Sequence, residues 1–138
     1  MKQLTVFIEN RPGRLGEVTE VLTENNINIV CLSLADTSDY GMLRMIVSQP
    51  AAACDVLSSS GFPAMLTDVI AVKLPHHFGQ LKKLCGKLSA ADVDISYMYA
   101  LTSGEGAAIV LKTSDNEKAE SVLSDEYTLM GAAEVYNL

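Results

Sequence analysis

The segment from Asn10 to Gly16 contains residue types that could bind a small anionic group. Pro12 and Gly13 have turn chemistry, and glycine lets a backbone approach a ligand closely. Apolar residues then recur at helical spacing from Leu15 to Leu22, so the turn should open an amphipathic helix. Free N–H groups at a helix start can receive a carboxylate, helped by the positive end of the helix dipole. A tight turn without any ligand explains the same residues equally well.

Other side chains offer little chemistry. The two histidines, His76 and His77, are adjacent, and no nucleophile motif accompanies them. They lack the spacing and the further ligands of a metal site, so we predict loop residues, no metal and no cofactor. A small enzyme that uses one of the two histidines as a base is a further hypothesis. It is the weakest one, because no residue that would orient the base is visible. We predict that the protein is not an enzyme.

Composition excludes several classes. The chain has 138 residues and a net charge of −7, and its ten Lys and Arg residues are scattered, so direct nucleic-acid binding is not expected. No stretch is long enough to span a bilayer, and residues 1–6 do not resemble a signal peptide, so we expect a cytoplasmic protein. Cys31, Cys54 and Cys85 stand in apolar contexts at unrelated spacings, which predicts buried thiols.

The chain repeats itself at a shift of 66 residues, without a gap. The shift places Pro12-Gly13-Arg14-Leu15 on Phe78-Gly79-Gln80-Leu81, and Asn28-Ile29 on Asp94-Ile95. We therefore predict two copies of one unit, with domains at residues 1–70 and 71–138. Paired copies create a pseudo-twofold interface, where small ligands commonly bind.

Each copy should contain the same elements. In copy one the pattern predicts a strand at 4–8, a helix from 15, a hairpin of 27–35 and 40–48 around the turn 36–39, a helix from 50 to about 61, and a strand within 65–74. This order is the ferredoxin-like split βαβ unit, an α+β fold. One long strand should end copy one and begin copy two, with a bend at 69–71. By the same shift, residues 131–138 should form the closing strand of copy two.

The sequence Glu9-Asn10-Arg11-Pro12-Gly13-Arg14-Leu15, followed by a helix and Asn26-Ile27-Asn28-Ile29, resembles the signature of ACT domains. The resemblance covers both copies. Copy one has Asn10 where the family usually has Asp. Copy two departs more, with His76 and Phe78 at the Asp and Pro positions, but it keeps Gly79, Leu81 and Val93-Asp94-Ile95.

This resemblance implies a regulatory module that binds amino acids, with two domains side by side in a continuous eight-stranded sheet, helices on one face, and ligands at the interface. It implies one site of Asn10, Arg11, Pro12, Gly13, Arg14 and Leu15 with Ile95, Ser96, Tyr97 and Met98, and a second of His76, Phe78, Gly79 and Leu81 with Ile29, Val30, Cys31 and Leu32. We favour the first site because it carries Pro12-Gly13. Tyr97 and Tyr99 should share a strand face, where they could line a pocket or pack at a seam.

The leading hypothesis is therefore a stand-alone tandem ACT protein that binds a free amino acid and signals through association with itself or with a separately encoded metabolic enzyme. The apolar run from Val30 to Leu34 suggests that a second chain covers the open face of the sheet, which predicts a homodimer. The rival is a protein–protein interaction module whose loop pocket holds no ligand, and the divergence of His76 to Phe78 favours it. Branched, aromatic and imidazole side chains all remain possible for the amino acid.

Overall fold

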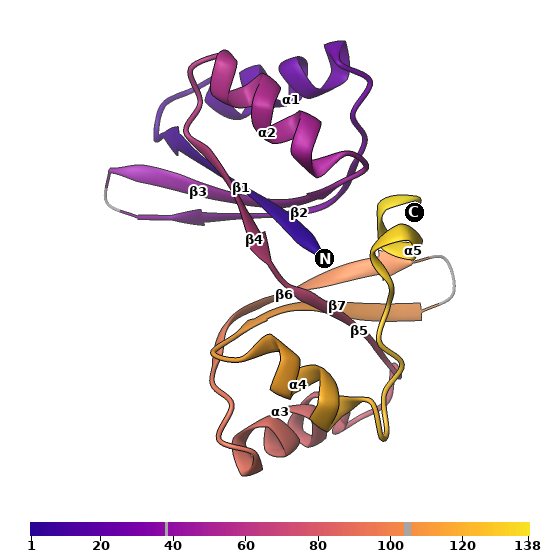
Figure 1. Ribbon diagram of the computed structural model, residues 1–138. Coiled ribbons are helices and arrows are strands. Elements are labelled where there is room, and N and C mark those ends of the chain that lie inside the picture. The colour runs from indigo at the N-terminus through magenta and orange to yellow at the C-terminus, as the bar shows by residue number, and fades with distance from the viewer. Residues whose placement is uncertain (38, 104–105) are drawn as a thin grey trace. The chain divides into compact units, whose positions relative to one another are not determined.

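The structure is a computed structural model that describes residues 1–37, 39–103 and 106–138 (Figure 1). These residues fold into two compact units. The N-terminal unit is Lys2–Thr67 together with Asn137, and the C-terminal unit is Asp68–Tyr136 together with Met1 and Leu138. The domain boundary expected after residue 70 stays a prediction.

The N-terminal unit has the expected element order. Its strands form one four-stranded sheet with the order β2-β3-β1-β4. Its elements are β1 (Lys2–Glu9), α1 (Arg14–Glu24), β2 (Ile29–Asp36), β3 (Tyr40–Val47), α2 (Pro50–Ser59) and β4 (Ala64–Asp68). Ser38, in the predicted hairpin turn, falls outside the described residues. Both helices cover the same face of the sheet (Figure 1).

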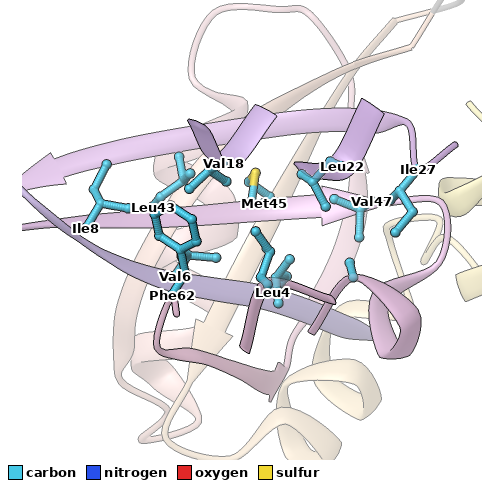
Figure 2. Close-up of a cluster of buried hydrophobic side chains, with 12 residues drawn as sticks. Leu4, Val6, Ile8, Val18, Leu22, Ile27, Leu43, Met45, Val47 and Phe62 are labelled. Atoms are coloured by element: carbon cyan, nitrogen blue, oxygen red, sulfur yellow. The ribbon is translucent and has the colours of Figure 1, made fainter. Parts of the chain in front are cut away.

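Strand alternation builds the core of this unit. Every second residue of β1 and β3 points to the helices, and Leu4, Leu43 and Met45 are fully buried there. Val18 and Leu22 of α1 lie against them, one helical turn apart on one face (Figure 2). The core therefore fixes α1, and with it the loop that precedes this helix, on the sheet.

The C-terminal unit repeats the architecture as far as its second long helix. Its elements are β5 (Ile70–Leu74), α3 (Gln80–Ala90), β6 (Ile95–Ser103), β7 (Gly106–Thr113), α4 (Asn116–Leu123) and α5 (Ala132–Tyr136). The strand order is β5-β7-β6. Leu84 and Leu88 of α3 are fully buried against this sheet, as Val18 and Leu22 are in the other unit. The α+β class with two βαββαβ-like units is confirmed.

The closing strand predicted at residues 131–138 is wrong, because α5 occupies most of that range. In its place, a short segment pairs with β5 through two backbone bonds: Lys73 donates to the carbonyl of Thr128 (2.9 Å) and Met130 donates to that of Ala71 (2.9 Å). The described residues form a four-stranded and a three-stranded sheet, so one continuous eight-stranded sheet is not confirmed.

The ungapped repeat also needs a correction. Phe62 donates its backbone N–H to the carbonyl of Leu57 (3.0 Å), and Tyr127 makes the same bond to Leu123 (2.9 Å). Leu57 and Leu123 obey the 66-residue shift, whereas Phe62 and Tyr127 are one residue short of it. Copy two therefore lacks one residue after its second long helix, and Tyr127 takes the place that Phe62 has in copy one.

The long strand shared by the two copies is interrupted within the range expected for its bend. β4 ends at Asp68 and β5 begins at Ile70, so only Val69 lies between them. Its backbone is held on both sides by Met1, whose amino group donates to the Val69 carbonyl and whose carbonyl accepts from the Val69 N–H (3.0 Å each).

Candidate functional site

The first loop is a turn that presents a helix start to solvent. Asn10, Pro12 and Gly13 are exposed. Gly13 adopts a left-handed conformation with φ of +91° at the N-cap of α1, and no side chain caps the helix. An L side chain at this φ would be strained, which explains glycine here although nothing lies within 4 Å of its missing Cβ. The expected turn before a helix is confirmed.

The start of α1 leaves hydrogen-bond donors open. The first intrahelical bond runs from the N–H of Glu17 to the carbonyl of Gly13 (3.0 Å). The N–H groups of Leu15 and Gly16 have no acceptor among the described residues. Two free donors beside an exposed glycine and the positive end of an 11-residue helix can bind a carboxylate.

Asn10 and Arg11 hold the loop in place within the unit. The side-chain amide of Asn10 donates to the Asp36 carboxylate (2.6 Å) and to the Thr37 carbonyl (3.0 Å), which ties the loop to the end of β2. The Arg11 guanidinium pairs with Glu9 (2.8 Å). Asn10 suits this position because its amide can donate to the Asp36 carboxylate, whereas an ionised Asp would repel it.

Arg14 is the one predicted site residue of this loop whose charge is mostly covered. Its side chain is 16% exposed and pairs with Glu17, and its guanidinium lies 4.3 Å from the centre of the Phe62 ring. The buried Nε has no hydrogen-bond partner. Leu15 packs against the apolar core. The Arg14 charge is therefore compensated by Glu17, and its side chain is fixed beside the helix start.

The second loop, His76 to Leu81, has the same backbone conformation as the first loop but exposes different side chains. His77 donates its N–H to the Pro75 carbonyl (2.8 Å), as Arg11 does to Glu9, and Gly79 repeats the left-handed conformation with φ of +84°. Phe78, in place of Pro12, is fully exposed, and Leu81 is 45% exposed.

The strand residues predicted to face these loops do not all point the same way. β2 carries a bulge between Ile29 and Cys31, and β6 carries one at the equivalent place between Ile95 and Tyr97. Val30 and Ser96 lie in these bulges, a feature that strands often have beside functional sites and that the repeat pattern did not reveal.

Beyond the bulges, register assigns the remaining side chains to faces. Leu32 pairs with Met45 and Met98 pairs with Leu111, so both lie on the helix side of their sheets. Cys31 and Tyr97 lie on the opposite side. Tyr99 shares the face of Tyr97, as expected.

Within a unit, the structure brings the first loop to the end of β2 at Asp36, not to Ile29–Leu32. The two predicted sites each combine residues of different units, namely Asn10–Leu15 with Ile95–Met98 and His76–Leu81 with Ile29–Leu32. Those pairings stay predictions.

Two cavities lie beside the second loop, His76 to Leu81, although the sequence favoured a site at the first loop. One, of about 720 Å³, is lined largely by apolar groups that include Phe78, Gly79 and Leu81. The other, of about 660 Å³, is lined by His76 and His77 and by polar residues from later in the chain. Both are built within the C-terminal unit.

The cavity of about 660 Å³ is lined by residues that the sequence analysis missed. Glu126 pairs with Lys83 (2.9 Å) and with Lys87 (3.3 Å), and Glu134 pairs with Lys73 (2.7 Å). Single charges far apart in sequence give no spacing signal. The lysines at 83 and 87, one helical turn apart on the expected helix, were the only available hint of a shared acidic partner.

The Glu126 ion pairs predict a measurable titration. Hydrogen bonds from Lys83 and Lys87 hold the pKa of the Glu126 carboxyl below its ordinary value. The stabilisation is therefore present above the ordinary pKa and is lost as the pH falls through the lowered one. In Lys83→Met we expect the Glu126 midpoint to rise, whereas that of Glu134, lowered by Lys73, should not move. Carboxyl-carbon NMR titration measures both, and an unmoved Glu126 midpoint would contradict the ion pair.

The cysteines are free thiols, but Cys31, Cys54 and Cys85 are half-buried rather than fully buried. Burial raises the pKa of Cys31. Among the described residues, no group of three or more His, Cys, Asp and Glu side chains could hold a metal ion. Neither does any helix in that part of the chain have the length and apolar character to cross a membrane.

Comparison with known proteins gives related structures along nearly the full chain. Protein BT0572 from Bacteroides thetaiotaomicron is 41% identical, with a TM-score of 0.93 over 99% of this chain and 96% of that one. The regulatory subunit of aspartate kinase from Thermus thermophilus, ligand-free, is 17% identical, with a TM-score of 0.65 over 89% of this chain and 88% of that one. The corresponding subunit from Thermus flavus is 18% identical, with a TM-score of 0.65 and 90% of each chain covered. No curated protein sequence matches significantly.

The two aspartate kinase subunits share the fold, and BT0572 shares sequence as well. The family model of the ACT domain pair matches residues 1–135, which span both units. The glycine turns before α1 and α3 are the elements that carried the resemblance in the sequence. This chain therefore belongs to the ACT domain pair family.

Proposed function

We propose that this protein is a regulatory, non-catalytic sensor that binds a free amino acid between its two ACT domains. In this proposal Asn10 to Leu15 contact the amino acid together with Ile95 to Met98. A second, pseudo-symmetric site combines His76, Phe78, Gly79 and Leu81 with Ile29 to Leu32.

One observation carries the proposal: both copies keep a left-handed glycine at the start of an uncapped 11-residue helix. In copy one the free N–H groups of Leu15 and Gly16 would receive the α-carboxylate. Arg14, held over Phe62 and paired with Glu17, would fix the start of this helix.

Partners follow from what the chain leaves exposed. β2 is an edge strand, and its Leu32 and Leu34 are 46% and 48% exposed. They lie on the helix side of the sheet, not on the open face as expected from the apolar run. An exposed apolar edge favours pairing with a second copy, so we propose a homodimer. A separately encoded metabolic enzyme is the proposed output, by analogy with the aspartate kinase subunits of the same fold.

The test is thermal unfolding of the full chain with each of the twenty amino acids at millimolar concentration. An amino acid at 100 times its dissociation constant should add about 2.7 kcal/mol, a shift of several degrees for a protein of this size. Isothermal titration on any hit then measures affinity. We expect one selective hit.

Matched variants locate that hit. Gly13→Val and Gly79→Val introduce the same strain at equivalent turns, with no neighbour within 4 Å of either missing Cβ. Gly13→Val should abolish binding at the favoured site, and Gly79→Val should not. Gly86→Ala, within α3 and two turns after Gly79, is the control that should leave affinity unchanged. Equal binding by all three variants would refute the site.

A second candidate function is a protein–protein interaction module without a bound ligand. The fully exposed Phe78, beside the half-exposed Leu81, favours it, because a phenylalanine in water is a typical anchor for a partner. No hit in the amino-acid panel, with capture of a partner protein that Phe78→Ser abolishes, would establish this alternative.

A further inference from the structure

One side chain, Asn10, connects the first loop to the end of the β2–β3 hairpin. Its Nδ2 donates to the Asp36 carboxylate (2.6 Å) and to the Thr37 carbonyl (3.0 Å). A side-chain amide has two N–H donors, so these two bonds use both of them. Asn10 therefore has no donor left for a ligand, and its contribution to the site lies in the position of the loop.

Gly41 leaves the space that this contact needs. β3 lies between β1 and β2, and Gly41 pairs with Ile8 on one side and with Asp36 on the other. A Cβ at Gly41 would lie 3.0 Å from Cγ1 of Ile8 and 3.3 Å from Oδ1 of Asn10. Non-bonded carbon atoms pack best at about 3.5–4.0 Å, so a side chain here would push Ile8 and Asn10 aside. Gly41 is not among the glycines with positive φ, so space and not backbone conformation explains it.

Copy two differs at all three positions of this contact. By the 66-residue shift, the equivalents of Asn10, Asp36 and Gly41 are His76, Thr102 and Ala107. The strand pairing is the same, because Ala107 lies opposite Leu74 and opposite Thr102. Neither the His76 nor the Thr102 side chain has a hydrogen-bond partner in the part of the chain that the structure describes. The amide, its acceptor and the glycine are thus present together in one copy and absent together from the other.

We propose that Asn10, Asp36 and Gly41 form a clamp that holds the first loop on the β2–β3 hairpin and so positions the two free N–H groups at the start of α1. Asn10 is a positioning residue in this clamp and donates no hydrogen bond to the ligand. The usual Asp of ACT domains would not serve here, because its carboxylate would be repelled by Asp36. A loop that is already ordered loses less entropy when a ligand binds, so the clamp favours the first loop over the second. The effect on binding rests on the proposed function, whereas the order of the loop does not.

The first measurement is amide nitrogen relaxation of the full chain, which reports backbone order on the picosecond to nanosecond timescale. In the wild-type chain, the order parameter at Gly13 should be about 0.85 and that at Gly79, in the loop without the clamp, should be lower. In Asn10→Asp two carboxylates face each other, so the value at Gly13 should fall toward about 0.6 while that at Gly79 stays the same. The contact between Asn10 and Asp36 is exposed, so the variant should fold.

A reversed pair separates positioning from direct contact with the ligand. Asp36→Asn, added to Asn10→Asp, restores an amide beside a carboxylate with donor and acceptor exchanged. The double variant should recover most of the lost order at Gly13. The affinity for the amino acid found in the thermal unfolding panel should fall about tenfold in Asn10→Asp and recover with the order parameter. An amide that binds the ligand itself could not be replaced from the other strand.

Two further variants are controls. Asn25→Asp makes the same chemical change at the end of α1, where the amide donates to the Val21 carbonyl (2.9 Å), and it should change neither loop order nor affinity. Gly41→Ala should loosen the first loop. Ala107→Gly, the reverse change at the equivalent place in copy two, should leave the second loop as it is.

The outcomes distinguish the clamp from the proposed function. An unchanged order parameter at Gly13 in Asn10→Asp would overturn the clamp. Recovery of loop order without recovery of affinity in the double variant would overturn the positioning role, since Asn10 would then contact the ligand itself. If no amino acid binds the wild-type chain, the proposed function fails, and the loss and recovery of order at Gly13 alone decide whether the clamp exists.

Discussion

Truncating Phe62 to alanine should lower the free energy of unfolding of the N-terminal unit by about 3–5 kcal/mol. The ring is 3% exposed, so its removal loses a large apolar contact and leaves a cavity in the core. It also removes the aromatic face that covers the Arg14 guanidinium at 4.3 Å, an interaction of about 0.5–2 kcal/mol. Hydrogen exchange at the amides of Leu43 and Met45 measures the change within this unit.

Phe62→Leu is the control, since leucine keeps most of the apolar volume but cannot cover the guanidinium. It should cost less than the alanine variant. If Phe62→Ala cost less than about 1 kcal/mol, the ring would not be part of the core. A linked outcome concerns binding: with the ring removed, Arg14 is no longer held beside the helix start, so the affinity of an amino acid at the first loop should fall as well.

Truncating Leu22 and Leu88 to alanine should each destabilise their own unit by about 2–5 kcal/mol. They are equivalent in the repeat, on α1 and α3, and are 1% and 0% exposed. Each truncation removes the same apolar group from a packed core. Amide exchange reports the change at Leu43 for the first variant and at Leu111 for the second, which avoids assuming that both units unfold together.

Leu32→Ala is the matched control, because this leucine is 46% exposed on the edge strand and should cost much less. A large effect of Leu32→Ala on the isolated monomer would mean that the edge is covered within the chain. A small effect of Leu22→Ala would contradict the packing of α1 on the sheet. Neither result depends on which ligand the protein binds.

Much of the fold could be predicted from the sequence because it depends on local signals. Alternation marked β1, enrichment in β-branched and large apolar residues around a turn marked β2 and β3, and helical spacing from Leu15 to Leu22 marked α1. Gly13 and Gly79 marked the two turns, and both adopt the left-handed conformation for which glycine is suited. These features require only a few neighbouring residues, so one sequence was enough to place them.

The last eight residues, 131–138, were predicted wrongly for a physical reason. Val135 is buried, as the repeat implied, but a short apolar run fits a strand or a helix equally well. The single missing residue before Tyr127 moves the terminal segment by one position relative to the repeat, and residues 132–136 are helical. Sparse identity between the copies concealed that deletion.

The candidate site, too, could be predicted only in part from the sequence. The sequence by itself determined the loops at Asn10–Leu15 and His76–Leu81 and their glycines, because turn and helix-start chemistry is local. Only the tertiary structure brought Tyr127, Glu126 and Glu134 together around one cavity with His76 and His77. These residues come from separate segments that meet only after β5, β7 and the terminal chain have packed, and no spacing rule relates them. Local backbone conformation depends on consecutive residues, whereas the shape of a cavity depends on packing between residues that are far apart in the sequence.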